Sequence, residues 1–284
     1  MTASSSSAVQ EARKTLGKRL REIRQAAGIE TARALAVRAG WHESKSSRIE
    51  NGVTLPSDAD IRVWAEVCGA EDQISELIST ARGIEEMYVD WRRLERAGLR
   101  HVQESVLPLY ERTHRFRFYQ SWVVPGLLQT PGYTGAVLAT VASLREAPGD
   151  VGDAVAARMA RQHILHSAGR RFAFLVEEWV LRTVIGNGEI MAAQLGRLIT
   201  VASLPSVSLG LIPMGAPRGR AWSTESFSIF DDELVGVELV SAHLNVRQPA
   251  GISEYARTFA ELAGVAVYGT QARNLITSAI NALE

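Results

Sequence analysis

The sequence lacks several patterns that would assign the protein to a common class. Cys68 is its only cysteine, so no disulfide can form within the chain, which favours a reducing, cytoplasmic location. No apolar run approaches the roughly 18 residues of a membrane-spanning helix, and the first residues lack the apolar stretch of a signal peptide. The glycine-rich fingerprints of dinucleotide-binding folds and P-loops are also missing. We therefore expect no membrane segment and no cofactor.

The chain also lacks net charge, because 31 Lys and Arg balance 31 Asp and Glu. The charge is unevenly spread, however, and residues 11–50 contain ten Lys and Arg against five Glu. A basic segment on a neutral chain is typical of a small domain that binds nucleic acid. With 284 residues, 46% of them hydrophobic, the chain is long enough for two domains.

Residues 32–51 contain the pattern that says most about function. Leu35, Ala36 and Ala39 fall at helical spacing, Gly40 comes four residues after Ala36, and Ile49 comes nine residues after that glycine. A small residue such as Ala36 lets two helices cross closely, and glycine adopts the left-handed conformation of a sharp turn without a Cβ clash. The second helix must then bury one side and leave the other free for the major groove. The pattern predicts a helix-turn-helix, and with it DNA binding.

The surrounding sequence predicts five helices in all. Residues 11–28 form the first, with an apolar stripe on one face and basic residues on the others. Thr31 is placed to cap the second helix. The fourth helix opens after Pro56, and the fifth starts near Asp72 and runs past Met87. These helices form an all-α head.

From about residue 105 the pattern changes. Segments rich in β-branched and aromatic residues predict strands at 171–178, 207–213, 226–232 and 234–242. Helical patterns are found near 153–168, 188–203, 250–266 and 270–283. Residues 125–133 have the composition of a loop with turns. The predicted fold class is an all-α five-helix helix-turn-helix head followed by a mixed α+β C-terminal domain.

These elements divide the chain into four parts. The serine-rich residues 1–10 are expected to form a disordered tail. Residues 11–80 form the helix-turn-helix domain, and residues 81–104 form a helical connector that includes the charged run DWRRLERAG. Residues 105–284 form an α+β domain with a regulatory or partner-binding role.

The third helix presents the side chains expected to touch DNA. On a helical wheel of residues 42–51, His42, Ser46 and Ile49 fall on the side that must face the first two helices. The residues on the opposite side and at its edges are polar and can bond with bases or phosphates. Together with residues of the second helix, the candidate DNA contacts are Thr31, Arg33, Glu43, Ser44, Lys45, Ser47, Arg48 and Asn51.

These candidates have different expected roles. Arg48 can fork onto O6 and N7 of guanine, and Glu43 can accept a hydrogen bond from N4 of cytosine. Lys45 and Arg33 are better suited to phosphates, and the start of the helix near Thr31 offers backbone N–H groups to a phosphate. The alternative is a helical hairpin with a solvated polar face, and the fourth helix that follows on schedule argues against it.

The residues around this turn resemble the XRE-type, or lambda-repressor-like, helix-turn-helix. The resemblance rests on the stretch LAVRAGWHESKSSRIENGVTLPS, whose matching positions are Ser47, Arg48, Ile49, Glu50, Gly52 and Pro56. It implies a domain of five helices in which residues at the front of the third helix read bases. Ser46 departs from the pattern, because an apolar residue usually locks this helix to its neighbours, although a buried serine can bond back to helix carbonyls.

The C-terminal part is similar to the C-terminal domain of the actinobacterial WhiJ-like, or toxin–antitoxin-like, regulators. The similar segments are WVVPGLLQTPGYTGAVL (122–138), ARMARQ (157–162), EEWVLRTVIGN (177–187) and QLGRLI (194–199). Members of that family combine an XRE-type head with a domain of unassigned function. The resemblance implies a small companion protein, encoded nearby, as a partner.

Other polar clusters have a structural interpretation. Glu177 and Glu178 are adjacent at the end of a strand, so they point to opposite faces and form no acid–base pair, and we expect an ion pair with Arg182. His163 and His166 have a spacing that could bind a metal. No third ligand clearly accompanies them, so we predict no metal site.

Five residues are candidates for binding a ligand or a partner. Arg218 and Arg220 form a basic loop near Trp222 that could contact a phosphate or an acidic ligand, although a solvated loop is the simpler interpretation. Trp122 and Gln129 belong to a segment that could line a pocket, although packing is the simpler interpretation there.

The favoured hypothesis is a transcriptional regulator that binds double-stranded operator DNA as a homodimer, because one such head covers only a half-site. Its C-terminal domain would supply dimer contacts and sense a companion protein or a ligand. An alternative is an antitoxin-like protein that sequesters a small partner and regulates its own operon. A third possibility is an enzyme with a DNA-binding head, but the sequence shows no constellation of catalytic groups.

Overall fold

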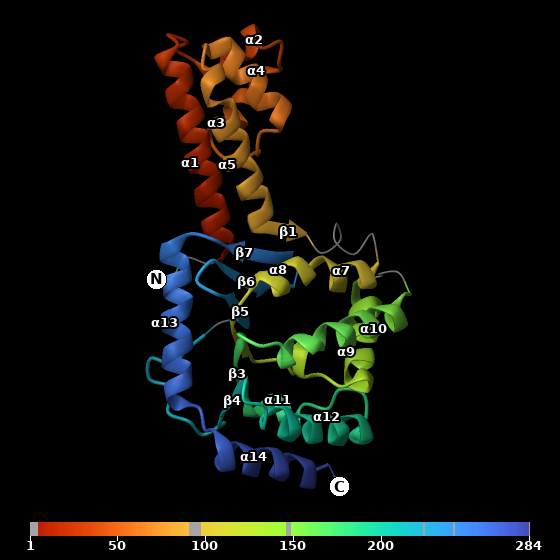
Figure 1. Cartoon of the computed structure of the whole chain (residues 1–284). Coiled ribbons are helices and arrows are strands. Elements are labelled where there is room, and N and C mark those ends of the chain that lie inside the picture. The colour runs from red at the N-terminus through yellow and green to blue at the C-terminus, as the bar shows by residue number, and fades with distance from the viewer. Residues whose placement is uncertain (1–4, 91–97, 146–148, 224, 241, 284) are drawn as a thin grey trace. The chain divides into compact units, whose positions relative to one another are not determined.

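The computed structural model describes residues 5–90, 98–145, 149–223, 225–240 and 242–283 (Figure 1). The chain divides into two compact units, Met1–Val89 and Asp90–Glu284. The division falls inside residues 81–104, the segment interpreted as a connector. Residues 91–97, which include most of its charged run, lie outside the described residues.

The first unit is helical, as predicted. Its helices are α1 (Ser5–Ala26), α2 (Ala32–Arg38), α3 (Glu43–Glu50), α4 (Asp58–Cys68) and α5 (Ile74–Met87), and a 3-10 turn, η1 (Glu71–Gln73), precedes α5. Helix α1 already begins at Ser5, so residues 5–10 are helical rather than a disordered tail. Burial of Val9 and a 3.2 Å hydrogen bond from Gln10 Nε2 to the Gly52 carbonyl hold this first part of α1.

The ends of these helices follow from local chemistry. Ser57 precedes α4 and forms a reciprocal capping box with Asp60, in which each side chain accepts a hydrogen bond from the other residue's backbone N–H at 3.2 Å. Gly28 and Gly69 follow α1 and α4 with φ of 72° and 64°, a conformation that glycine adopts without strain. The end of α1 near Gly28 agrees with the predicted first helix, residues 11–28.

The core of the first unit is built from all five helices, α1 to α5. Its largest fully buried side chains include Leu20, Leu35, Ile49, Ile61 and Trp64. Helix α1 touches the end of α3 closely at Gly17, where a Cβ would come within 2.5 Å of the Glu50 carbonyl oxygen. Glycine is therefore required at this crossing, which fixes α3 against α1.

The second unit contains a six-stranded mixed sheet, which confirms the predicted α+β class. Its strands are β2 (Arg115–Gln120), β3 (Arg171–Glu177), β4 (Val207–Ile212), β5 (Phe227–Phe230), β6 (Leu234–Glu238) and β7 (Ala242–Val246), in the order β7-β6-β5-β2-β3-β4. Strands β2, β3 and β4 are parallel, whereas β5, β6 and β7 are antiparallel to their neighbours. A further short strand, β1 (Tyr88–Asp90), lies at the boundary of the two units.

Aromatic residues of β2 and β3 form the centre of this sheet. Phe116 is paired with Phe172 and Phe118 with Phe174 in the parallel register, and the rings stack with centroids 4.6 and 5.1 Å apart. Offset stacking of this kind adds to the stabilisation from burial alone. Strand β2 was not predicted, although its arginines at 115 and 117 alternate with phenylalanines, which is a strand pattern in a segment of only six residues.

The helices of the second unit are α7 (Leu99–Ser105), α8 (Leu107–Arg112), α9 (Pro131–Arg145), α10 (Val151–Arg161), α11 (Glu178–Arg182), α12 (Gly188–Val201), α13 (Pro249–Val265) and α14 (Gly269–Asn281). The 3-10 turns are η2 (Gly126–Leu128) and η3 (Gln162–His166). Helices α12, α13 and α14 confirm the sequence prediction. Helix α9, by contrast, starts inside the segment 125–133 that was expected to be a loop, and β7 was not predicted as a separate strand. Among the described residues, no helix is long and apolar enough to cross a bilayer.

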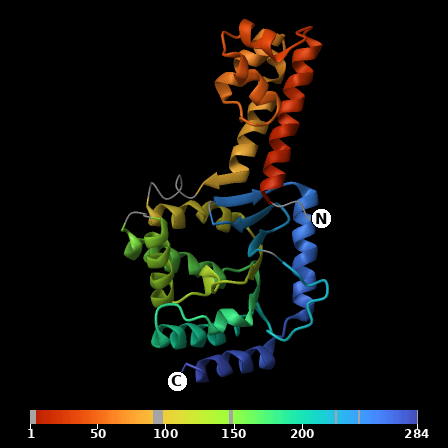
Figure 2. The ribbon, with the colours of Figure 1, turned by 180° about the vertical axis from the view of Figure 1, so that it is seen from behind.

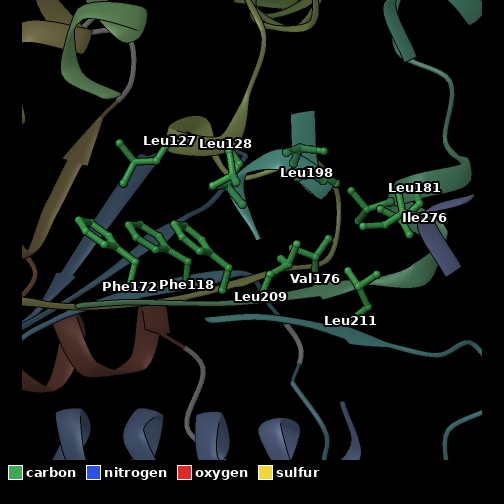
Figure 3. Close-up of a cluster of buried hydrophobic side chains, with 14 of the residues drawn as sticks. Phe118, Leu127, Leu128, Phe172, Val176, Leu181, Leu198, Leu209, Leu211 and Ile276 are labelled. Carbon is green, nitrogen blue, oxygen red and sulfur yellow. The ribbon is translucent and has the colours of Figure 1, made fainter. Parts of the chain in front are cut away.

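Helices cover both faces of the sheet. Figures 1 and 2 show α13 on one side and α9, α10 and α12 on the other. Phe227 of β5 meets Phe259 of α13 edge to face. On the opposite face, Leu128 and Leu198 lie across the core from Phe118 (Figure 3). The sheet is therefore buried on both faces, as parallel strands require.

Candidate nucleic-acid interface

Helices α2 and α3 form the predicted helix-turn-helix. Thr31 caps α2 by accepting a hydrogen bond from the Ala34 backbone N–H at 3.1 Å. Gly40 has a φ of 67°, and the next N–H, of Trp41, donates to the Ala36 carbonyl at 2.8 Å, which closes the turn. The small buried Ala36 lies at the crossing of the two helices, as its size requires.

One side of α3 is held in the core. Ile49 is buried, and Ser46 is fully buried with its hydroxyl donating to the Ala32 carbonyl of α2 at 2.6 Å. Ser46 therefore replaces the usual apolar contact with a hydrogen bond between the two helices. The assignment of His42 to this buried side was wrong. His42 is exposed and caps α3, because the helix begins at Glu43 and the helical wheel does not apply to the residue before it.

A buried ion cluster, missed in the sequence, fixes the end of α3. Glu50 accepts hydrogen bonds from Arg24 at 2.5 and 3.1 Å and from Arg21 at 3.0 Å, both on α1. Arg24 also donates to the Ile29 carbonyl at 2.5 Å. A paired, hydrogen-bonded ion cluster of this kind is costly to break. The sequence feature that could have indicated this cluster is Glu50, which directly follows the buried Ile49 at the end of a short helix.

The opposite side of α3 is open to solvent. Ser44, Ser47 and Arg48 are exposed there. Within the described part of the chain, the Arg48 guanidinium makes no hydrogen bond and no ion pair, so all its donors are available. Asn51 at the end of the helix is more constrained, since it donates to the Ser47 carbonyl at 2.9 Å and accepts from Arg21 at 3.0 Å.

The charged residues at the edges of this surface are paired within the unit. Arg33 and Glu43 form an exposed ion pair at 3.1 Å. Lys45 binds Asp60 of α4 at 2.6 Å and lies 4.4 Å from the centre of the Trp41 ring. Burial raises the pKa of Asp60, but the hydrogen bonds from Lys45 and the capping residue outweigh it and leave that pKa lowered. Sequence alone showed none of these partners.

The ligand-binding candidates of the second unit have contrasting surroundings. Trp122 and Trp222 are 72% and 70% exposed, and Arg220 is exposed as well. Gln129, by contrast, is only 2% exposed, and its amide donates to the Val124 carbonyl at 2.7 Å. It is a buried structural residue rather than a surface one.

Three residues discussed in the sequence analysis, Trp122, Glu177 and Arg218, lie at or near the carboxyl ends of β2 and β3 or contact them. Trp179, which follows β3, donates to the Ser121 carbonyl at 2.6 Å, next to Trp122. The Arg218 guanidinium binds both carboxylate oxygens of Glu177, at 2.8 and 2.6 Å. The loop after β4 is thereby tied to β3.

Two further polar clusters were considered in the sequence, the glutamates near Arg182 and the histidines at 163 and 166. The ion pair expected with Arg182 is present and involves Glu178, at 2.9 Å. His163 and His166 are both exposed. No group of residues in the described ranges has the composition and placement to hold a metal ion.

The fold and the exposed helix of the first unit define a DNA-binding regulator of the helix-turn-helix class. A family model described as a helix-turn-helix domain matches residues 15–77. A second, described as a domain of unknown function (DUF5753), matches residues 103–278. The chain belongs to this DUF5753 family, whose description assigns no activity to the domain. No curated protein and no solved structure matches the chain.

Proposed function

We propose that this protein is a transcriptional regulator that binds operator DNA as a homodimer, with α3 of each copy in the major groove. The observation that carries the proposal is Arg48, exposed and without a protein partner among the described residues. The other side of α3 is held by Ser46, Ile49 and Glu50. An arginine on a helix so fixed can fork onto O6 and N7 of one guanine.

The neighbouring side chains would complete the contact. The Ser44 and Ser47 hydroxyls are exposed and can bond with bases or phosphates. Arg33 and Lys45 would exchange their carboxylate partners for DNA phosphates, because an exposed or half-exposed ion pair contributes little binding free energy. Thr31 uses its hydroxyl to cap α2, so it would act as a positioning residue.

We assign dimer contacts and the reception of a signal to the second unit. Two heads on a palindromic operator read half-sites about 34 Å apart, so a dimer contact outside the heads would set their spacing. The exposed Trp122 and Trp222 are the candidates for such contacts, because tryptophan is enriched where proteins meet. The signal would be a small companion protein or a ligand.

The same two tryptophans also favour a second candidate function. An antitoxin-like protein that sequesters a small partner would need an exposed apolar surface of this kind. Stable co-purification with a small protein encoded beside it, lost on Trp122→Ala, would support this alternative.

The test is fluorescence anisotropy with the DNA upstream of the protein's own gene. It should be run at about 150 mM salt with excess competitor DNA, because non-specific binding depends steeply on salt. We expect Arg48→Ala to cost about 1–3 kcal/mol of binding free energy, concentrated at one base position.

The matched control is Arg62→Ala, which removes the same charge from an exposed position on α4. Arg62 borders a surface hollow that is lined by residues of η1 and α5 and by no residue of α3. We expect this variant to keep the affinity and the sequence preference. A loss that is equal on all DNA sequences for Arg48→Ala would make Arg48 a phosphate contact and contradict its reading role.

A further inference from the structure

Two arginines of α10 lie together inside the second unit. Arg158 and Arg161 are three residues apart, so their side chains share one face of the helix. Arg161 is 6% exposed and Arg158 is half-buried. The η2 turn lies against both, since a Cβ on Gly126 would be 3.7 Å from Arg158 Cδ and 3.8 Å from Arg161 Nη2. We call these two residues the arginine pair.

Amides, not carboxylates, surround the arginine pair. Arg158 donates to the side-chain oxygens of Gln103 at 2.9 Å and Gln129 at 2.8 Å, and Arg161 Nη1 donates to the Gln103 carbonyl at 2.9 Å. Across the described residues neither arginine forms an ion pair. Glu238 raises the pKa of Arg158 only through space, against the larger lowering effects of burial and of the Arg161 charge.

Two other buried or half-buried arginines among the described residues are matched by carboxylates. Arg24 binds Glu50 at 2.5 Å, and Arg218 binds Glu177 at 2.6 Å. Burial and the neighbouring cation lower the pKa of Arg158 to about 10, as expected where positive charge is uncompensated. A buried charge without a partner is unfavourable, so the arginine pair needs another source of negative charge.

Hydrogen-bond donors remain free at the arginine pair. The Arg161 Nε is fully buried and has no partner. The Nη2 atoms of both arginines make no hydrogen bond within the described ranges. Guanidinium groups with free nitrogens match the oxygens of carboxylates and phosphates, which they bind through two parallel hydrogen bonds.

We propose that the arginine pair is a binding site for a small ligand that carries an oxyanion, either a carboxylate or a phosphate. The ligand must be small, because the guanidinium of Arg161 is almost entirely enclosed and lies 4.9 Å from the Tyr110 ring centre. This inference deepens the proposed function and rests on it in one respect, since the oxyanion would be the signal that the second unit receives. Binding of the oxyanion itself does not depend on DNA.

The test is thermal unfolding of the full chain with inorganic phosphate and, separately, acetate, at constant ionic strength balanced with sodium chloride. A ligand that binds only the folded state raises Tm in a saturable way, by about 5–10 °C at a hundredfold excess over Kd. A response to phosphate alone would identify a phosphate ligand, and a response to acetate alone a carboxylate.

Three variants make the test specific. Arg161→Met should abolish the response, and Arg158→Lys, which keeps the charge but loses the planar fork, should raise the half-saturating concentration. Arg257→Met, on the exposed side of α13, is the matched control and should respond as the original chain does. No saturable response to either anion, or an equal response in Arg161→Met, would overturn the proposal. A chain that failed to bind operator DNA would still show the response, so the two failures are distinguishable.

Discussion

The crossing of α1 and α3 and the inner face of α10 treat buried positive charge in opposite ways. In the first unit, Arg24 is buried against the carboxylate of Glu50, and the pair ties α1 to α3. In the second unit, Arg158 and Arg161 are enclosed by amides, and a donor of Arg161 is left without a partner. A matched charge stabilises a crossing of helices, whereas an unmatched charge inside a fold is a place where a ligand can bind.

The largest expected effect concerns the matched charge. Glu50→Ala leaves the Arg24 guanidinium buried without its carboxylate, and breaking a buried pair costs about 3–5 kcal/mol of unfolding free energy. Denaturant unfolding of the full chain measures the loss, and hydrogen exchange localises it to α1 and α3.

The control for this prediction is a glutamate on the same helix. Glu43 pairs with Arg33 in solvent, at side-chain exposures of 57% and 79%. We expect Glu43→Ala to cost no more than about 1 kcal/mol. If Glu50→Ala and Glu43→Ala lowered the free energy of unfolding equally, burial would not make the Glu50–Arg24 pair more stabilising than the Glu43–Arg33 pair.

The next effect has the opposite sign. Arg161→Met removes an unmatched buried cation while keeping an unbranched side chain of apolar character. Replacing buried charges with apolar groups is often neutral or stabilising, by up to about 4 kcal/mol. We therefore expect the free energy of unfolding in sodium chloride to stay unchanged or rise. A clear decrease would show that the guanidinium is a structural hydrogen-bond donor and would remove the contrast between the two regions.

The smallest effect concerns a half-exposed pair. Lys45 lowers the pKa of Asp60, so the ionised carboxylate stabilises the fold above the ordinary aspartate pKa of about 3.9. This contribution is lost as pH falls through the lowered folded pKa, and it should not exceed about 1 kcal/mol because Lys45 is 40% exposed. Unfolding between about pH 5 and pH 2 would measure it. Asp60→Asn, which keeps a side-chain oxygen for the cap, should show a correspondingly shallower fall.

The helix-turn-helix could be predicted because its determinants are close together in the sequence. Ala36, Gly40 and Ile49 act through helical spacing and one left-handed backbone conformation. The cap at Thr31 is likewise a contact over three residues. The error at His42 came from extending the helical period one residue beyond the start of α3.

The second unit was harder to predict because its sheet joins distant segments. Strand β2 lies between β3 and β5, with Phe116 opposite both Phe172 and Phe230. The two arginines of β2 are not typical of a central strand. Its central position follows from its pairing with β3 on one edge and with β5 on the other. Helix α9 was missed because its first residues, Pro131 and Gly132, also suit a turn.

Helix spacing and turn composition were sufficient to assign a DNA-binding head and an α+β domain, because both depend on residues a few positions apart. Which charges are free was decided only by the fold. In the sequence both Arg48 and Lys45 are cations of the third helix, yet Lys45 pairs with Asp60 of α4 whereas Arg48 is exposed to solvent. Likewise, Arg158 and Arg161 become a candidate site only because folding encloses them and brings no carboxylate within ion-pair distance.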